Sequence, residues 1–309
     1  MISNFLNVLT QVLILLILIS VGFVLTKRKL LNDHSAKGIT NLVLYVVSPC
    51  VIVDCFAKYE YSKEALKSLI TGFIIVVLLH VIFIVISFVF LRDKDISTSR
   101  VIRFGAIFSN CGFMSLPLQQ AILGETGLFL GAIYVAAFNL ITWTFGLWLM
   151  SGDKKQLSIK KLIFNPGIIG FAVGLILFLF SIKLPNIVMK PIGYFAALNT
   201  PLPMLLIGCY LANSKFLDAI KNKKCMLTVA FKLLIIPTAG LSAMYLCGVR
   251  GDMLIAMTIA SSAPVATITT MFSEKFNCNT GLSASAASIS TVLSLITMPI
   301  IITLAQTIS

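Results

Sequence analysis

Apolar segments long enough to cross a membrane recur along the whole chain, and this pattern limits the fold more than any other feature. Ten such segments can be marked, each close to the roughly 20 residues that a helix needs to span the hydrocarbon core. Only 11% of the 309 residues are charged, and the mean hydropathy is +1.01. We therefore predict an all-α polytopic membrane protein with ten transmembrane helices. The segments are 5–26, 38–57, 66–91, 102–123, 126–150, 162–182, 191–213, 226–248, 253–273 and 280–307.

The first apolar segment lacks the basic region that precedes the apolar core of a secretory signal. Because it is long enough to span, we expect it to stay in the protein as the first helix. The seven cysteines form no C-x-x-C pair and are odd in number, so neither a disulfide framework nor a zinc site is indicated. We expect no metal and no cofactor, apart from H⁺ or Na⁺ as a coupling ion.

Basic residues gather in short clusters between the apolar segments, as expected for loops that face the cytoplasm. With the N-terminus outside, 17 of the 24 Lys and Arg residues fall in cytoplasmic loops and 6 in outer loops, while Lys232 lies within a span. This ratio predicts a multi-pass protein of the cell membrane with both termini outside. The net charge of +13 does not indicate nucleic-acid binding, because no continuous basic face or aromatic platform accompanies it.

The two halves of the chain resemble each other at a constant spacing. Pro49 and Pro203 are 154 residues apart, and two T-G-L tripeptides show the same separation. Since each half has five spans, an odd number, the second half must cross the membrane upside down relative to the first. We predict two inverted five-helix repeats, residues 1–154 and 155–309, an arrangement typical of secondary transporters that bind substrate near the midplane.

The stretch S-N-C-G-F-M-S-L-P-L, from Ser109 to Leu118, interrupts the fourth span. Asn110, Gly112 and Pro117 all weaken a helix, and freed backbone groups at bilayer depth are tolerated only where protein or a water-filled cavity satisfies them. Pro264 interrupts the ninth span at a similar depth. We predict that the broken fourth and ninth helices cross each other near the midplane.

These motifs resemble those of the auxin efflux carrier family, which includes plant PIN carriers and bacterial permeases assigned to malate and malonate. The resemblance covers essentially the whole chain. It implies ten helices in an inverted repeat, with two Pro-broken crossover helices in a mobile transport bundle beside a scaffold bundle, commonly in a homodimer. Ile268 departs from the pattern, since many bacterial relatives have Asn there. The motifs are N-L-V-L-Y-V-V-S-P, N-C-G-F-M-S-L-P-L, A-P-V-A-T-I-T-T-M-F-S-E-K-F and S-T-V-L-S-L-I-T-M-P.

A half-helix that begins at each break leaves N–H groups without intrahelical partners, and together with the helix dipole they form an anion site that needs no Lys or Arg. Hydroxyls near Pro264 can donate to the same anion, coordinate Na⁺, or bond their own helix. Asn139 can reach the crossover or hold neighbouring helices together. At most one of Gln119 and Gln120 can face the site. The predicted substrate-binding residues are Asn110, Gly112, Ser115, Pro117, Gln119, Asn139, Ser261, Ser262, Pro264 and Thr267.

Two basic residues inside spans are candidates for proton coupling, because ionisable groups at bilayer depth are costly. His80 can carry a proton or hydrogen-bond a neighbouring helix. Lys232 lies close to the cytoplasmic pair Lys223 and Lys224, so its side chain is expected to extend outward to the interface, with a coupling role as the alternative. Asp54, near the outer end of the second span, is expected to be a hydrated end residue, with a cation or proton role as the alternative.

The sequence thus predicts a secondary active transporter of small organic anions, such as malate, malonate or auxin-like acids, whose partners are the substrate and membrane lipid. The alternative is a cation-coupled antiporter or a sodium/organic-anion symporter of the same architecture. No acidic residue lies within Ser109–Leu118 or Ala260–Phe272, which disfavours proton antiport. We expect no enzyme, because buried Asp pairs, H-E-x-x-H and a P-loop are all missing. A sensor that works through a separate output protein is a further alternative.

Overall fold

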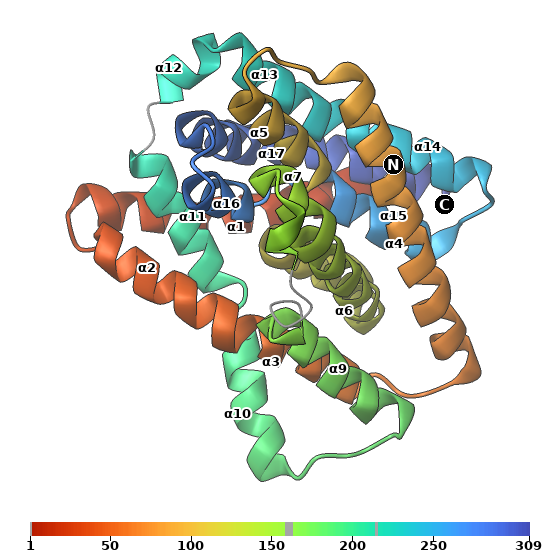
Figure 1. The fold of residues 1–309 in the computed structure, drawn as a ribbon. Coiled ribbons are helices and arrows are strands. Elements are labelled where there is room, and N and C mark those ends of the chain that lie inside the picture. The colour runs from red at the N-terminus through yellow and green to blue at the C-terminus, as the bar shows by residue number, and fades with distance from the viewer. Residues whose placement is uncertain (1, 158–162, 214–215) are drawn as a thin grey trace.

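The computed structural model describes residues 2–157, 163–213 and 216–309, and every regular element within these ranges is a helix (Figure 1). The predicted all-α class is therefore confirmed. The α-helices are α1 (Ile2–Lys27), α2 (Asp33–Leu42), α3 (Ser48–Lys58), α4 (Lys63–Phe90), α5 (Ile96–Ile107), α6 (Leu116–Ile141), α7 (Leu147–Ser151), α9 (Pro166–Leu179), α10 (Asn186–Ala197), α11 (Pro201–Asn213), α12 (Phe216–Lys221), α13 (Lys223–Ala230), α14 (Ile236–Leu246), α15 (Gly251–Ser262), α16 (Ile268–Lys275) and α17 (Thr280–Ile308).

Seven helical stretches in this part of the chain are long and apolar enough to cross a membrane, and α9 is a shorter apolar helix. The predicted fourth span is divided between α5 and the start of α6, and the predicted ninth span between α15 and α16. The stretch Cys111–Ser151 joins parts of two predicted spans across a kink at Gly124, whose φ of 60° favours glycine. Two of the three missing spans therefore fall where helices are broken or sharply kinked, and the third is the predicted sixth span, where α9 is a shorter helix.

Polar residues in the loops fix where several helices begin. In each case a side-chain oxygen accepts a hydrogen bond from an N–H group in the first turn, which would otherwise have no partner. The capping residues are Asn32 for α2, Ser62 for α4, Asp95 for α5, Asn165 for α9, Asn222 for α13 and Asn279 for α17.

Widened π-helical turns precede three prolines. The turns η1 (Val43–Val47), η2 (Cys111–Ser115) and η5 (Phe231–Ile235) come before Pro49, Pro117 and Pro237. Proline has no N–H to donate, and its ring crowds the carbonyl four residues earlier, so the turn before it opens. A further π-turn, η3 (Thr142–Gly146), precedes α7 without a proline, and η4 (Lys154–Gln156) is a short 3₁₀-helix.

Small residues let α1 and α11 pack almost backbone to backbone. A Cβ on Gly22 would collide with the carbonyl group of Leu205, and one on Gly208 would collide with the carbonyl oxygen of Ile19. Such close approach suits helices in a membrane, where packing and not water drives their association. In the same way, Gly170 and Gly174 let α9 pack closely on α3.

The central helices of the fold are those that carry the breaks. Helix α6 packs against α15, α15 against α17, and α5 against α13 and α17, with α4 and α14 alongside. Helices α3, α9 and α10 lie together at the lower end in Figure 1, away from α13 and α14. Helix α1 contacts α6 and α17, so it connects the α1–α11 pair to the central group.

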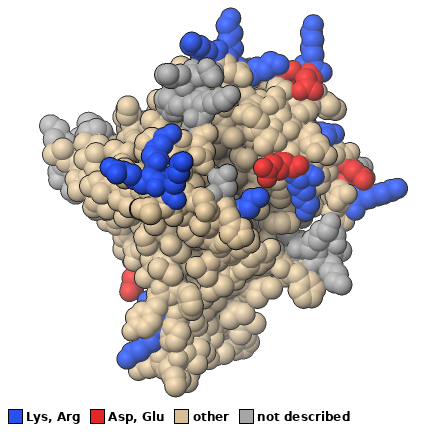
Figure 2. Space-filling model, turned by 90° about the vertical axis from the view of Figure 1, so that its left-hand side faces the viewer, with Lys and Arg blue, Asp and Glu red and all other residues tan. Residues whose placement is uncertain are grey.

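The surface is that of a membrane protein. Helix α4 exposes a row of apolar side chains at helical spacing, Ile70, Ile74, Leu78, Val81 and Val85, each at least half exposed. On the face seen in Figure 2, most Lys and Arg side chains gather over the upper part, a small charged group lies at the lower left edge, and the surface between them is largely uncharged. An uncharged, apolar surface between charged ends suits a multi-pass protein in a bilayer.

The close α1–α11 contact gives a first prediction. Gly208→Ala is expected to lower the unfolding midpoint by several degrees, because the added methyl group has no space and overpacking costs about 1–3 kcal/mol. Gly38→Ala is the control, since nothing lies within 4 Å of the position of its added Cβ. Thermal unfolding of the purified variants measures both. Equal midpoints for Gly208→Ala and the wild type would contradict this packing.

Candidate functional site

The two interrupted helices meet through their extended backbone. The N–H of Asn110 donates to the carbonyl oxygen of Pro264 at 2.8 Å, and the N–H of Ala266 donates to the carbonyl oxygen of Phe108 at 3.1 Å. These bonds form an antiparallel bridge between Ser109 and Val265. The prediction that the segments around Asn110 and Pro264 meet is therefore confirmed.

A serine from α17 completes this bridge. Ser290 Oγ accepts a hydrogen bond from the N–H of Val265 at 3.1 Å, and it donates to the carbonyl oxygen of Ala287 at 3.1 Å. The backbone groups at the contact between the two breaks thus find partners inside the protein, as a membrane interior requires. Ser290 lies on the α17 face that packs against the crossover.

The start of η2 presents backbone N–H groups beside open space. Gly112 and Phe113 do not donate to a backbone carbonyl among the described residues, and both are partly exposed. Nothing lies within 4 Å of the position that a Cβ on Gly112 would occupy. The neighbouring Asn110 is 5% exposed, and its side chain does not cap the turn. Asn199 Nδ2 donates to the Gly112 carbonyl oxygen at 3.1 Å, which fixes the turn from the α10–α11 connection.

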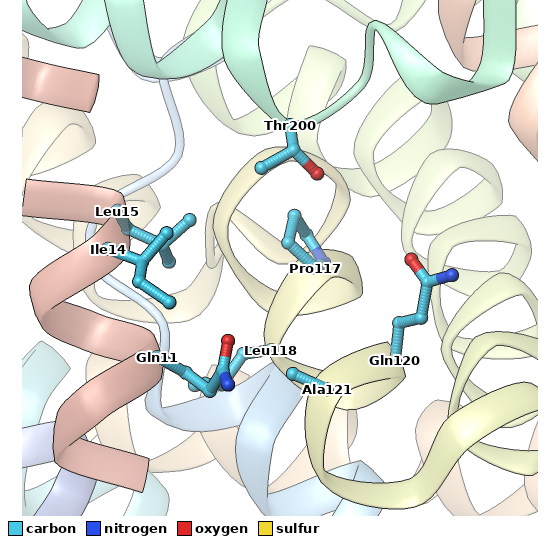
Figure 3. Close-up of a pocket in the computed structure, with 8 residues that line it drawn as sticks. All are labelled: Gln11, Ile14, Leu15, Pro117, Leu118, Gln120, Ala121 and Thr200. Carbon is cyan, nitrogen blue, oxygen red and sulfur yellow. The ribbon is translucent and has the colours of Figure 1, made fainter. Parts of the chain in front are cut away.

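A cavity of about 260 Å³ lies between α1 and the start of α6, which follows this turn in the chain. Of the predicted site residues, Pro117 lines it, and Asn110 and Gly112 do not. Figure 3 shows Pro117 below Thr200, with Gln11 and Gln120 on opposite sides of the space. Its polar groups are therefore amides and a hydroxyl, which can donate to an anion without a fixed charge. The lining residues are Gln11, Ile14, Leu15, Pro117, Leu118, Gln120, Ala121 and Thr200.

Of the two glutamines after Pro117, the structure directs Gln120 and not Gln119 to this cavity. Gln119 is fully buried, and its Nε2 donates to the carbonyl oxygen of Ala256 in α15 at 2.8 Å. Ser115 is also fully buried, and its Oγ has no hydrogen-bond partner among the described residues. Gln119 thus ties α6 to α15.

The hydroxyls before Pro264 bond their own helix. Ser261 Oγ donates to the carbonyl oxygen of Thr258 and Ser262 Oγ to that of Ile259, both at 3.1 Å. Thr267 precedes α16, and its side chain makes no capping hydrogen bond. These hydroxyls support the break in α15, and none of the three residues lines the cavity.

Asn139 lies away from the crossover. Its Nδ2 donates to the Val135 carbonyl oxygen at 3.0 Å, and its side chain lies against Gly167 at the start of α9. The structure therefore places Asn139 between α6 and α9, where it holds neighbouring helices.

Lys232 does not extend to the interface, and that expectation was wrong. Its side chain is fully buried, and Nζ donates to the carbonyl oxygen of Ser261 at 3.2 Å. The widened turn η5 carries Lys232 toward the α15 break. His80 is fully buried as well: its Nδ1 bonds the Val76 carbonyl oxygen at 2.8 Å, and its Nε2 has no partner among the described residues.

A second, smaller cavity of about 80 Å³ shares Gln120 with the first. It contains the ion pair between Lys58 Nζ and Asp54 Oδ2, 2.8 Å apart, and it is also lined by Glu125. Asp54 is 8% exposed, so it is more buried than expected for an end residue, although it lines this cavity and its partner Lys58 is exposed. No group of three His, Cys, Asp or Glu suited to a metal ion occurs in the described ranges.

Sequence reasoning missed Gln11 and Thr200 as cavity residues, and of the two glutamines after Pro117 it selected Gln119, whereas Gln120 lines the cavity. A signal existed for Thr200, because the polar and proline-containing run Asn199-Thr200-Pro201 interrupts the apolar segment 191–213. A glutamine within the first apolar segment was the corresponding signal for Gln11.

The fold and the crossover define a helical membrane transporter, in which broken helices meet beside a cavity. The profile described as membrane transport protein matches residues 7–302. The chain therefore belongs to this family, the auxin efflux carrier family.

Relatives agree with this assignment. An uncharacterized transporter of Methanothermobacter thermautotrophicus is 24% identical over 293 residues, which cover 94% of this chain and 95% of the relative. One from Methanocaldococcus jannaschii is 26% identical over 301 residues, covering 92% and 94%. The auxin efflux carrier component 1 of Arabidopsis thaliana is 25% identical over 131 residues, which cover 41% of this chain and 21% of the carrier.

The bridge gives a second prediction. Ser290→Ala removes the acceptor of the Val265 N–H, and a buried N–H without a partner costs about 1–3 kcal/mol. We expect a lower unfolding midpoint and faster amide exchange at Val265. Ser283→Ala is the matched control, because Ser283 is also buried on α17 but bonds only its own helix, at Thr280. Equal unfolding midpoints and equal Val265 exchange rates in the two variants would show that the hydrogen bond to Val265 does not stabilise the fold.

Proposed function

We propose that the protein is a secondary active transporter of small organic anions, with carboxylates such as malate, malonate or auxin-like acids as the substrate class. The observation that carries this proposal is the crossover, because the segment that follows it, at the start of α6, lines a cavity. The proposal includes ten spans in two inverted repeats, both termini outside the cell membrane, and a homodimer. These finer features follow the family resemblance and the charge pattern of the loops.

The anion is proposed to bind at the start of η2. Backbone N–H groups of Gly112 and Phe113, the Asn110 amide and the dipole of the following helix all favour negative charge. Gln11 and Gln120 can donate to other oxygens of the same substrate from the two sides of the cavity. No acidic side chain lines this cavity, so nothing there repels an anion.

Alternating access is proposed to occur where the α1–α11 pair meets the crossover. The contact is apolar: Val12 and Leu15 of α1 pack in one cluster with Met114, Leu118 and other residues near the breaks. Apolar side chains can slide past one another without breaking hydrogen bonds, so this contact suits relative movement. Gln120, which borders both cavities, marks the proposed route between the site and the Asp54–Lys58 pair.

Transport by reconstituted protein tests the substrate class. Uptake of labelled malate, malonate, lactate and indole-3-acetate is measured in proteoliposomes under imposed H⁺ and Na⁺ gradients. We expect saturable transport of at least one carboxylate, and the gradient that drives it identifies the coupling ion. Activity on a cation with failure of every carboxylate would overturn the proposal in favour of a cation-coupled antiporter.

A third prediction concerns Asn110. Asn110→Ala is expected to raise the KM for the carboxylate about tenfold, because a hydrogen bond to a charged group contributes about 1.5–3 kcal/mol. Asn139→Ala is the matched control, since this asparagine bonds its own helix away from the crossover. An unchanged KM in Asn110→Ala, with normal folding, would remove Asn110 from the site.

A fourth prediction concerns coupling. His80 is proposed to carry a coupled proton, because its Nε2 is buried without a partner in the described chain. His80→Gln is then expected to abolish the dependence of transport on an imposed pH gradient while the protein still binds substrate. If the pH-gradient dependence of this variant matched that of the wild type, His80 would have only a structural role.

A further inference from the structure

Lys232 brings a positive charge from one helix to the broken end of another. It lies in η5, and its Nζ donates to the Ser261 carbonyl oxygen at 3.2 Å. Ser261 belongs to the last turn of α15, directly before the break at Ala263. Lys232 is fully buried and does not line either cavity. Its ammonium group therefore interacts with the end of α15 and not with solvent.

The C-terminal end of α15 requires donors or a cation. The last carbonyls of a helix have no intrahelical partner, and aligned peptide dipoles give this end about half a negative charge. The hydroxyls of Ser261 and Ser262 bond the carbonyls of Thr258 and Ile259, but the Ser261 carbonyl is bonded by Lys232. In transporters with broken helices, such carbonyl ends coordinate Na⁺ or H⁺.

No carboxylate pairs with Lys232 in the described part of the chain. Helices α5, α15 and α17 pack against η5; α17 carries no charged residue, and the acidic residue of α15, Asp252, lies at its opposite end. The two ion pairs among residues 2–157, 163–213 and 216–309 both include an exposed lysine, namely Lys58–Asp54 and Lys224–Asp93.

The titratable groups near Lys232 also supply no negative charge. His80 and Cys111 lie close enough to interact with its ammonium group, but a histidine is never anionic here and a thiol is neutral at pH 7. Arg100 and Arg103 of α5 donate to backbone carbonyls elsewhere. The helix end is therefore the negative partner that the described structure offers to Lys232.

We propose that Lys232 is a built-in cation of the crossover, which holds the C-terminal end of α15 in place of a bound Na⁺. The ammonium group of Lys232 balances the helix end on one side of the crossover, so that an anion can bind at the N–H side without a soluble cation. The inference rests on the transport architecture proposed above. The test below is done without substrate. The role of Lys232 can therefore be disproved while carboxylate transport is confirmed, and carboxylate transport can be disproved while the role of Lys232 is confirmed.

The test compares thermal unfolding of purified protein in NaCl and in choline chloride at equal ionic strength. We expect the wild type to unfold at the same temperature in both salts, because the cation position is filled. Lys232→Ser vacates the space beside Ser261. This variant is expected to unfold earlier in choline and to gain about 3 °C or more in NaCl, because a bound ligand stabilises the folded state.

Two further variants separate charge from packing. Lys232→Met fills the space without a charge, and we expect it to unfold earlier than the wild type in both salts. Lys223→Ser is the control, since Lys223 is exposed on α13, and we expect no salt-specific shift.

A Na⁺-dependent midpoint in the wild type would overturn the proposal, as would a Lys232→Ser variant that responds alike to both salts. If Lys232→Ser does not fold, Lys232→Met decides: a midpoint equal to that of the wild type would overturn the proposal, and a lower one supports it.

Discussion

Backbone groups that leave a helix inside a membrane must find partners within the protein, because hydrocarbon offers none. The two broken helices provide most of those partners for each other, because the N–H of Asn110 bonds Pro264 and the N–H of Ala266 bonds Phe108. Ser290 of α17 accepts the hydrogen bond from the N–H of Val265. With these groups paired, the N–H groups of Gly112 and Phe113 do not donate to a backbone carbonyl in the described chain, one turn before the Pro117 end of the cavity. The candidate site is thus a consequence of how the protein satisfies its own interrupted backbone.

The breaks were predictable because their causes are local. Asn110, Pro117 and Pro264 disfavour a helix whatever surrounds them, and an interruption within an apolar segment indicates a site. The all-α class was predictable from hydropathy because the length of each apolar segment is also a local property of the sequence. The N–H groups at Gly112 were also foreseen, because a helix that starts at a break must leave such groups open.

Side-chain direction was not predictable, because it depends on the exact path of the helix. A widened turn changes the phase of the residues that follow, so a simple helical count does not show that Gln120 faces the cavity while Gln119 bonds Ala256. The same effect applies to Lys232. Its position in the sequence suggested a side chain that extends to the interface, but the widened turn η5 directs it into the protein. Gln11 and Thr200 come from elements distant in sequence, and only tertiary packing brings them to Pro117.

The central claim is that the crossover binds a carboxylate at its open N–H groups. An experimental structure of the protein with a brominated small carboxylate, phased to locate the bromine by anomalous scattering, tests it most directly. We expect interrupted helices that meet at Ser109 and Val265, and a bromine peak in the cavity between Gln11 and Gln120. Continuous helices at these positions, or a carboxylate bound elsewhere with this cavity empty, would contradict the account.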